Sequence, residues 1–517
     1  MKTIFGKQLF KLKEIFGIGL FLMVVFTKTL SAQDFPGYRA GNYTGVNGVF
    51  FNPANIADSR YRWDFNLFSL STSVGNNQAS FSLKNIGQTF KDDSLINQFV
   101  GKNAGTSSGN VNVNINGPSL LFNTGKKSSF ALTTRARVMM NATDIDGKLA
   151  DKLLQDVAND PELPYTIRSA GNMQVSINSW TEFGLSFGQV LKEEGKHFLK
   201  GGITLKYLGG VANGYANVGN LNATIDQNNV NLMPYLQNTT GRLELGLGGV
   251  DISDFDQEKL SSFQSSGFGG DIGFVYEFRP EHDRYKLDSN SWRRDLNKYK
   301  FRIGVALLDI GSIKYERDMQ RSGGYDISIN GSEKLNLSEF DGVAIDSLKN
   351  YFDKNPQYFT PAGGNAATNY RVNLPTTLQI DADYHFNRGF YVSFSGQLSL
   401  VNTKSKPYNS QYYSAFAITP RYEGRRFGLY VPISYNQLTN FNAGVSMRLG
   451  PLFIGSGSVL TALMGNSRQA DVHIGLRFGG LQKNKVKKQE KAQRKAERKE
   501  LKAEKKANEK PVVGEGG

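Results

Sequence analysis

Strict alternation of apolar and polar residues, repeated along most of the chain, constrains its fold more than any other feature. In "MQVSINSWTEFGLSF" (173–187), Met, Val, Ile, Phe and Leu fall on odd positions, while Gln, Asn and Glu fall on even ones. The same period recurs in "VNVNI" (111–115), "TLQIDADYHF" (377–386) and "ADVHIGLRF" (470–478). A period of two residues indicates β-strands with one apolar and one polar face.

Three properties of these strands favour a membrane barrel over a soluble β-sandwich, which would show similar alternation. The runs exceed the roughly 5–6 residues of a usual strand and approach the roughly 9–11 that a membrane strand needs. Their polar faces carry charges, and aromatics such as Phe187, Phe386 and Phe478 stand near strand ends on the apolar parity. We therefore predict an all-β protein, with a transmembrane antiparallel β-barrel over residues 60–480.

The lengths of the connections predict the topology of the barrel. Tight connections at 125–128, 387–389, 424–426 and 449–451 alternate with longer ones, which lie near 87–108, 143–171, 209–266, 317–373 and 402–411, with medium ones near 191–197 and 280–298. Outer-membrane barrels have short periplasmic turns, longer external loops and usually an even strand number. The count is 14 if 60–86 is one kinked strand, whose apolar parity slips between Leu67 and Phe68 as at a bulge. A hairpin at 60–86 would instead make the count odd.

The N-terminus has the layout of a signal peptide. Lysines precede the short apolar run "IFGIGLFLMVVF" (15–26), and small residues follow at Ser31 and Ala32. We expect cleavage after Ala32 and location of the mature protein in the outer membrane; a retained helical anchor is the alternative. The chain has no cysteine, which excludes disulfides, a lipid anchor on an N-terminal cysteine and thiolate metal sites.

The net charge of +15 is concentrated at the two ends of the chain. Residues 481–517 hold 13 Lys and Arg against 6 Asp and Glu, and residues 1–32 hold 5 Lys against 1 Glu. The barrel between them is close to neutral for its size, so nucleic-acid binding is not indicated. Strong helix formers dominate 485–510, which predicts a basic, partly helical periplasmic tail. It is either a disordered spacer or an attachment to peptidoglycan or anionic lipid.

Residues 33–59 form a glycine-rich stretch without strand periodicity, ending in Asn52, Pro53 and Ala54. Asn before Pro favours an extended or turn geometry. We expect this segment to fold into the lumen as a hatch, since a barrel of 14 strands is wide enough to need filling or to pass solute. The Asn-Pro-Ala turn would lead from the hatch into the wall, either as part of a gate or as a simple strand-entry turn.

Several motifs resemble the FadL-type family of outer-membrane transporters. "GNYTGVNGVFFNPANIADSRYRWDFNL" (41–67) looks like the hatch and first strand of that family, and 268–278 and 301–315 resemble its consecutive strands and those of relatives in type IX secretion. Residues 441–460 and the final strand resemble a group of largely uncharacterised barrels related to them. The resemblance implies a plugged barrel that moves hydrophobic molecules inward, with a hatch that shifts and a lateral opening in the wall. No motif matches a fatty-acid pocket.

No set of residues points to catalysis, and we expect neither an enzyme nor a cofactor. Asp381, Asp383 and His385 share one face and could form a metal or proton site. A lumenal polar ladder, with Arg135 and Arg137 as natural partners of these carboxylates, is the favoured interpretation. Its members would be Arg135, Arg137, Glu182, Asp381, Asp383 and His385.

Two functions remain open at this stage. The first is passive uptake of hydrophobic or amphipathic solutes. The second is a barrel without transport activity, either an accessory of a larger complex for type IX secretion or barrel assembly, or a structural protein. Expected partners are outer-membrane lipid, hydrophobic small molecules, other outer-membrane proteins and, through the tail, peptidoglycan or anionic lipid.

Overall fold

The computed structural model describes residues 34–78, 80, 82–83, 105–154, 162–168, 171–249, 265–288, 291–340, 343, 347–362, 367–465 and 467–482. The expected signal peptide at 1–32 lies outside the described residues. So does the expected tail from residue 483 onward, and so does the loop predicted near 87–108 for most of its length.

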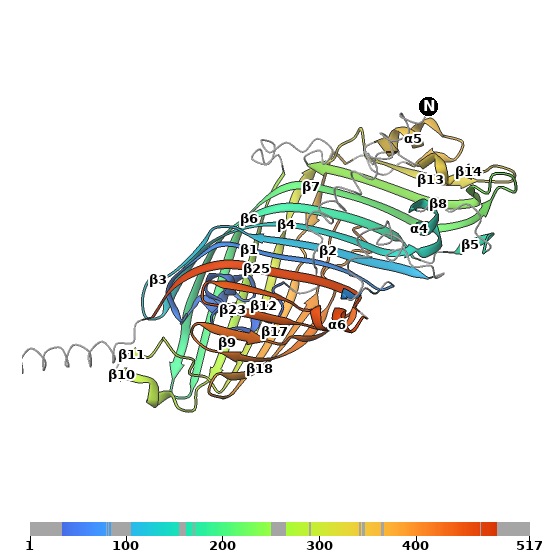
Figure 1. Ribbon diagram of the computed structural model, residues 1–517. Coiled ribbons are helices and arrows are strands. Elements are labelled where there is room, and N and C mark those ends of the chain that lie inside the picture. Colours follow the sequence, from blue (N-terminus) through green and yellow to red (C-terminus); the bar gives the residue numbers. More distant parts are fainter. Residues whose placement is uncertain are drawn as a thin grey trace, which may run out of the picture.

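The described chain forms a closed antiparallel barrel of 14 strands, as the alternation and turn lengths predict (Figure 1). Four wall strands consist of two short segments each, and β25 pairs with β1 to close the wall. In chain order the wall contains β1 (Tyr61–Asn76), β2 and β3 (Thr106–Asn116 and Ser119–Asn123), β4 (Ser128–Asp146), β6 (Met173–Glu194), β7 (His197–Gln227), β9 (Ser265–Phe278), β12 (Phe301–Glu316), β16 and β17 (Asn369–Asn373 and Thr377–Asn387), β18 (Phe390–Ser399), β19 (Ala415–Glu423), β20 and β21 (Phe427–Tyr430 and Ile433–Asn436), β22 and β23 (Asn440–Ala443 and Val445–Leu449), β24 (Leu452–Ser456) and β25 (Gln469–Leu481).

The two faces of the wall differ in chemistry as the sequence predicts. Large apolar side chains on the outer face are exposed, among them Leu132, Phe183, Leu205, Phe394 and Ile418. Inward-facing positions are buried and polar, among them Ser129, Arg137, Glu182, Asp383 and Arg477. Exposed aromatics flank the tight turns: Phe386, Phe390, Tyr422, Phe427 and Phe478. An apolar outer belt bounded by aromatics is the surface of a transmembrane barrel.

The predicted tight turns are present at one end of the barrel, here called the tight-turn end. Two predicted connections and the predicted length of the first strand need correction. The medium loop at 191–197 is a two-residue turn, because β6 and β7 pair up to Glu194 and His197. The long loop at 209–266 is largely a hairpin of β7 with β8 (Pro234–Gly249). The first strand ends at Asn76, short of the predicted residue 86.

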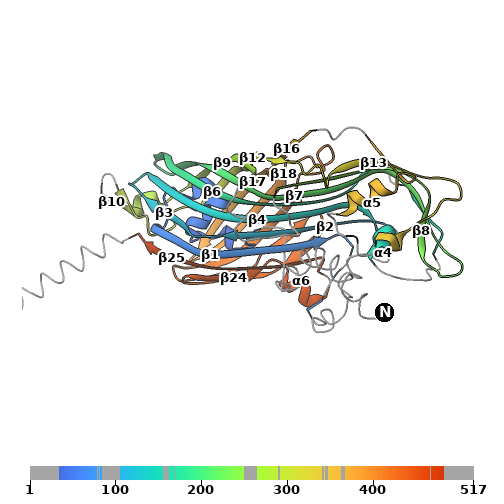
Figure 2. The same cartoon turned by 90° about the horizontal axis from the view of Figure 1, so that it is seen from above.

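The opposite, long-loop end carries a second layer with its own core. The β7–β8 hairpin extends beyond the barrel and pairs with β13 (Gly323–Ile329) and β14 (Leu335–Asn336) (Figure 2). The smaller elements at this end are β5 (Tyr165–Arg168), β15 (Phe359–Pro361), α4 (Gly147–Leu154), α5 (Leu348–Lys354), α6 (Val459–Met464) and η7 (Leu337–Phe340). Buried side chains hold part of it together: Leu243, Leu245, Tyr325, Ile329, Leu335, Phe352 and Phe359.

Two further small elements lie between β9 and β12. They are the 3₁₀ turn η6 (His282–Tyr285) and the hairpin of β10 (Lys286–Asp288) with β11 (Ser291–Trp292). Both occur at the tight-turn end in Figure 1. Within the described ranges, no helix is long and apolar enough to span a membrane.

Residues 34–60, here called the N-terminal segment, lie inside the barrel, where Figure 1 shows their blue helical turns. They form three short 3₁₀ helices, η1 (Tyr38–Ala40), η2 (Gly45–Phe50) and η3 (Pro53–Ile56). Their apolar side chains are buried against inward-facing wall residues, in one cluster made by Val46, Val49, Ile56, Leu121 and Ala131. The segment therefore fills lumen that the sequence predicts to be occupied.

Candidate functional site

The Asn-Pro-Ala motif docks the N-terminal segment onto the wall. Asn52 caps η3, because its side-chain oxygen accepts a hydrogen bond from the Ala54 amide at 2.9 Å. Pro53 occupies the first helical position, where its fixed φ is favourable. The Asn52 amide group also donates to the carbonyl oxygens of Phe274 and Val305, at 3.2 and 3.3 Å. The motif thus attaches to β9 and β12, and the chain enters the wall only later, at Tyr61.

The wall receives this motif on a surface made of glycine. Gly188, Gly202, Gly273 and Gly304 lie on β6, β7, β9 and β12, which are consecutive in the wall. A Cβ atom at Gly202 would lie 2.4 Å from the Pro53 carbonyl carbon, and one at Gly273 would lie 2.3 Å from the Asn52 side-chain oxygen. Gly188 approaches Ile56 of η3 as closely, since a Cβ there would lie 2.6 Å from Ile56 Cγ1, whereas a Cβ at Gly304 would be in ordinary contact, 3.4 Å from the Asn52 side-chain nitrogen. Gly188, Gly202 and Gly273 therefore permit an approach that a larger residue would block, and they are as much a part of the docking site as the motif itself.

The earlier part of the segment is tied to the other side of the barrel by buried polar contacts. The Asn42 amide donates to both carboxylate oxygens of Glu423, at 2.9 and 3.0 Å. The Val46 amide donates to Asp64 at 2.8 Å, and Asp64 is also paired with Arg477. Residues 42–46 are therefore held to β19, β1 and β25.

A cluster of charges around Asp58, here called the Asp58 cluster, fixes the C-terminal end of the segment. The Asp58 carboxylate lies 2.8 Å from Arg279, 3.1 Å from Lys298, 3.4 Å from Arg294 and 3.8 Å from Arg60. Burial alone would raise the pKa of the Asp58 carboxyl. The four cations outweigh this effect and hold its pKa well below the usual range.

Three residues of the predicted polar ladder meet in the lumen. The Glu182 carboxylate accepts from Arg135 at 2.7 Å, from Arg137 at 3.0 Å and from the Trp180 indole at 2.8 Å. Asp309 is the second acid, 2.8 Å from Arg137 and 3.3 Å from Arg135. Arg135, Arg137 and Glu182 are thus part of a buried network of charges in the lumen.

Sequence reasoning missed the rest of this network. Lys206 bridges Asp309 at 2.6 Å and Asp271 at 2.7 Å, and all three side chains are buried. Asp309 lies at a bulge of β12, with φ +58°, and its amide donates to Asp271 at 2.8 Å. We call Arg135, Arg137, Glu182, Lys206, Asp271 and Asp309 the charge lattice. The alternation places Lys206 on the polar face of β7, and a break in parity marks Asp309, but neither signal shows that the two side chains meet.

The other predicted members of the ladder lie elsewhere. Asp383 pairs with Arg421 at 2.7 Å, so the expectation that Arg135 and Arg137 would be partners of the β17 carboxylates is wrong. Asp381 faces the lumen near Arg39 and Arg302. His385 is half-buried, with its ring stacked 4.4 Å from that of Tyr391. Among the described residues, no three His, Asp or Glu side chains gather as a metal site would require.

The wall itself is interrupted between β2 and β3. Asn116 pairs with Arg135 and Leu120 with Leu132, so the chain has three residues here where β4 has two. The interruption falls at Gly117 and Pro118, here called the wall break. Proline cannot donate a hydrogen bond to its neighbour strand, which suits it to such a position. Across from it, Leu67 is the extra residue of a bulge in β1, as predicted.

Side chains close the wall break from both sides. On the inner side, the Asn66 amide group donates to the carbonyl oxygens of Asn116 and Gly117, at 3.1 and 3.0 Å. On the outer side, the Thr134 hydroxyl donates to the Pro118 carbonyl at 3.0 Å. Asn47 of the N-terminal segment donates in turn to Asn66, at 3.2 Å. The segment thus contacts the residue that closes the break.

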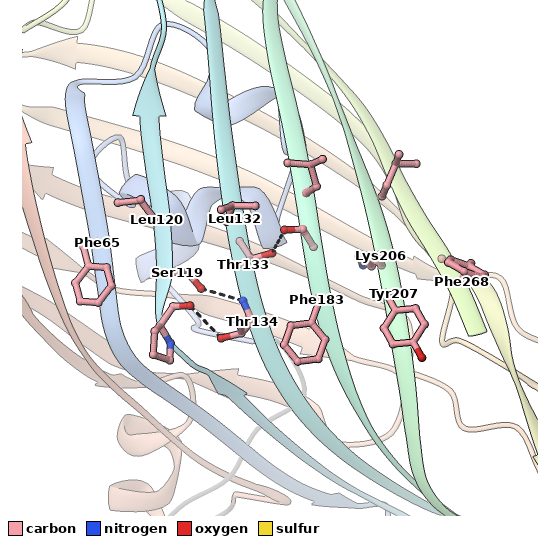
Figure 3. A pocket seen from close by; sticks show the side chains of 15 residues that line it. Phe65, Ser119, Leu120, Leu132, Thr133, Thr134, Phe183, Lys206, Tyr207 and Phe268 are labelled. Carbon is pink, nitrogen blue, oxygen red and sulfur yellow. Dashed lines mark hydrogen bonds between the residues drawn. The ribbon is translucent and has the colours of Figure 1, made fainter. Parts of the chain in front are cut away.

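An apolar groove of about 740 Å³ lies over the wall break on the outer face of the barrel (Figure 3). Side chains from β1, β3, β4, β6, β7 and β9 line it, among them Phe65, Leu120, Leu132, Phe183, Tyr207 and Phe268. Helical turns of the N-terminal segment lie behind the same strands in Figure 3. The interruption of the wall therefore lies between the apolar groove on the outside and the N-terminal segment on the inside.

Comparisons with known proteins identify a family. A family model described as "Family of unknown function (DUF5723)" matches residues 53–457. No curated protein matches the chain.

Solved structures of similar shape are distant in sequence. A Pseudomonas aeruginosa FadL homologue is 12% identical, with 87% of this chain and 98% of that one covered and a TM-score of 0.38. The Ralstonia pickettii toluene transporter TbuX is 12% identical over 87% and 99%, with a TM-score of 0.37. The P. putida toluene transporter TodX is 10% identical over 86% and 95%, with a TM-score of 0.38.

Proposed function

The chain belongs to DUF5723, a family of unknown function, and we propose that it is an outer-membrane barrel that admits hydrophobic or amphipathic solutes. In this proposal the N-terminal segment is a hatch. A solute enters from the long-loop end, passes the hatch and leaves sideways through the wall break into the membrane. Short turns at one end and long loops at the other orient the barrel, with the tight-turn end periplasmic.

The observation that carries the proposal is the chain of contacts through the wall. Asn47 of the hatch bonds to Asn66, Asn66 bonds to the carbonyl oxygens beside the break, and the apolar groove begins on the other side. Displacement of the hatch would remove Asn47 from Asn66. Asn66 would then be free to release the two carbonyls that it covers, Asn116 and Gly117.

A specific observation favours a second candidate, a barrel that does not transport. The charge lattice and the Asp58 cluster fill lumen space with buried, mutually paired charges, which resist rearrangement because separated charges would be left unpaired. Such a barrel would act as a structural protein or as an accessory of a larger complex, with the predicted basic tail among its points of attachment.

Uptake of a hydrophobic probe separates the two candidates. N-phenyl-1-naphthylamine fluoresces once it reaches an inner membrane, so its rate of entry into intact Gram-negative cells can be followed directly. We expect cells with the barrel in their outer membrane to take it up faster than cells without it. Equal rates would support the candidate without transport.

A pair of matched variants tests the route. Thr134→Phe places a ring over the wall break and should slow uptake toward that of cells without the barrel. Ile418→Phe adds the same ring to the lipid-facing side of β19, away from the groove, and should leave the rate unchanged. Equal rates in the two variants would contradict passage through the wall break.

A further inference from the structure

A row of asparagines lines the lumen along β2. Asn110, Asn112, Asn114 and Asn116 alternate with outward-facing residues, and each is at most 4% exposed. The row, here called the asparagine ladder, runs toward the tight-turn end and stops next to Gly117, where the wall break begins.

Much of the ladder has no hydrogen-bond partner within the described part of the chain. Both amide atoms of Asn112 and both of Asn116 are buried and unpartnered, as is the side-chain oxygen of Asn110. The Ser73 hydroxyl, on β1 opposite Asn112, is in the same condition. Buried amide groups normally have hydrogen-bond partners, so this group of unpartnered atoms indicates a place for a polar ligand or for water. By contrast, Asn141 on neighbouring β4 exchanges two hydrogen bonds with Gln411, both 3.0 Å long.

The cationic side chains beside the ladder already have oppositely charged partners. Arg135 and Arg137 lie opposite Asn116 and Asn114 on β4, but their guanidinium groups pair with the charge lattice. Within the described ranges, Asp34 is the carboxylate that contacts the ladder, and it accepts from Asn114 at 2.6 Å. The buried Nε atom of Arg137 has no partner within the described residues, but its guanidinium charge is balanced by Glu182 and Asp309, and an anionic ligand would also face Asp34. Amide groups offer one acceptor and two donors each, which suits hydroxyl or amide groups.

We propose that the asparagine ladder binds the uncharged, hydroxyl- or amide-bearing head group of a single-chain amphiphile, whose hydrocarbon tail passes through the wall break into the apolar groove. The inference rests on the proposed function and specifies its substrate class. Asp34 and Phe35 cover the ladder in this structure, through bonds from Asn114 to Asp34 and from the Phe35 amide to Ser71. The head group replaces these first residues of the hatch when the hatch moves.

Binding of matched amphiphiles tests the head-group preference. The full-length barrel in lipid nanodiscs is titrated with octyl β-D-glucoside and with octanoate, which share a chain length, and binding to empty nanodiscs is subtracted. We expect dissociation constants at least tenfold lower for the glucoside. Equal constants for glucoside and octanoate would overturn the inference.

Variants assign the binding to the ladder. Asn112→Leu combined with Asn116→Leu should weaken glucoside binding at least tenfold, while Asn141→Leu, at a partnered asparagine of the next strand, should not change it. Uptake of N-phenyl-1-naphthylamine, which has no hydroxylated head, is measured for each variant as a check of folding and transport. Unchanged glucoside binding in the double variant with normal probe uptake refutes the ladder and leaves the proposed function standing. Absence of probe uptake in the wild type refutes both.

Discussion

The lumen wall contains two polar surfaces that look alike in sequence and differ in how they are satisfied. On β4, β6, β7, β9 and β12, the charge lattice joins every member to at least one opposite charge at 3.3 Å or less. On β2, the asparagine ladder leaves the amide atoms of Asn112 and Asn116 without partners in the described chain. The side chains of both surfaces point into the lumen. The alternation of polar residues therefore predicts which side chains face the lumen. It does not predict whether they are paired with one another or available to a ligand.

The difference has an energetic consequence. A buried charge that loses its partner is strongly destabilising, whereas a buried amide that already lacks a partner gives up little when it is replaced by an apolar group of similar size. The charge lattice should therefore be intolerant of substitution and the ladder tolerant. The predictions below test this contrast, in order of expected effect.

Removal of Glu182 should have the largest effect. Glu182→Ala leaves Arg135 and Arg137 with Asp309 as their remaining acid, and we expect it to lower the free energy of unfolding by about 3–5 kcal/mol. Urea-induced unfolding in lipid vesicles measures the loss. Glu194→Gln, at the exposed β6–β7 turn, is the control and should cause no measurable change. A small loss at Glu182 would mean that the lattice is hydrated and loosely held.

The Asp58 cluster extends the comparison from the wall to the hatch, and its effect on docking should not depend on pH in the mildly acidic range. Because the pKa of Asp58 is depressed, its stabilisation is complete above the unfolded-chain value of about 3.9 and is lost only as the pH falls through the lower folded value. Burial lowers the pKa of its partner Lys298 to about 8, so this cation is fully charged only below the neutral range. Protease resistance of residues 34–60 should therefore be constant from pH 6 to pH 4.5. Asp58→Asn should expose the segment to protease throughout that range, and a wild-type segment released near pH 5 would contradict the assignment.

A methyl group on the glycine surface should weaken docking of the hatch without unfolding the barrel. Gly202→Ala places a Cβ against the Pro53 backbone, and we expect a cost of roughly 1–3 kcal/mol from overpacking together with a raised ion conductance in planar bilayers. Gly125→Ala is the matched control, because a Cβ there would contact nothing within 4 Å. Unchanged conductance for Gly202→Ala would show that η3 does not need close contact with β7.

Replacement in the ladder should have the smallest effect. Asn112→Leu exchanges an unpartnered buried amide for an apolar group of similar size, and we expect the free energy of unfolding to change by less than about 1 kcal/mol, or to rise. The same urea titration measures it beside Glu182→Ala. A loss comparable to that of Glu182→Ala would mean that the ladder belongs to the scaffold.

The sequence predicted the wall far better than the contacts across the lumen. The alternation in 173–187 and 470–478 gave the facing of those strands, the parity slip at Leu67 gave the bulge, and turn lengths gave the strand number. These features are local, because each depends on neighbours along the chain or in adjacent strands. The alternation predicts a first strand that extends too far, because polar and apolar residues alternate again beyond Gly75 and Asn76, where β1 ends. It predicts a loop in place of the β7–β8 hairpin, because glycine and asparagine interrupt the alternation in β7.

The site was predicted only in part, for a geometric reason. Arg135, Arg137 and Glu182 were found because they lie on neighbouring strands, while Asp309 comes from a strand that is not adjacent to theirs. Which side chains meet across a lumen depends on the stagger of the whole barrel, which sequence parity does not specify. For the same reason, Asn52 could be recognised as a turn residue, but the glycines of four separate strands that lie against it and the rest of η3 could not.

A reversible lock on the hatch tests the central claim most directly. The chain contains no cysteine, so Asn47→Cys together with Ser69→Cys, whose parent side chains lie 3.2 Å apart, introduces one defined pair between the hatch and β1. We predict that oxidation of this pair reduces uptake of N-phenyl-1-naphthylamine to the rate of cells without the barrel, and that reduction restores it, while either single variant is insensitive to both treatments. Uptake that is equal in the oxidised and reduced double variant would contradict a movable hatch.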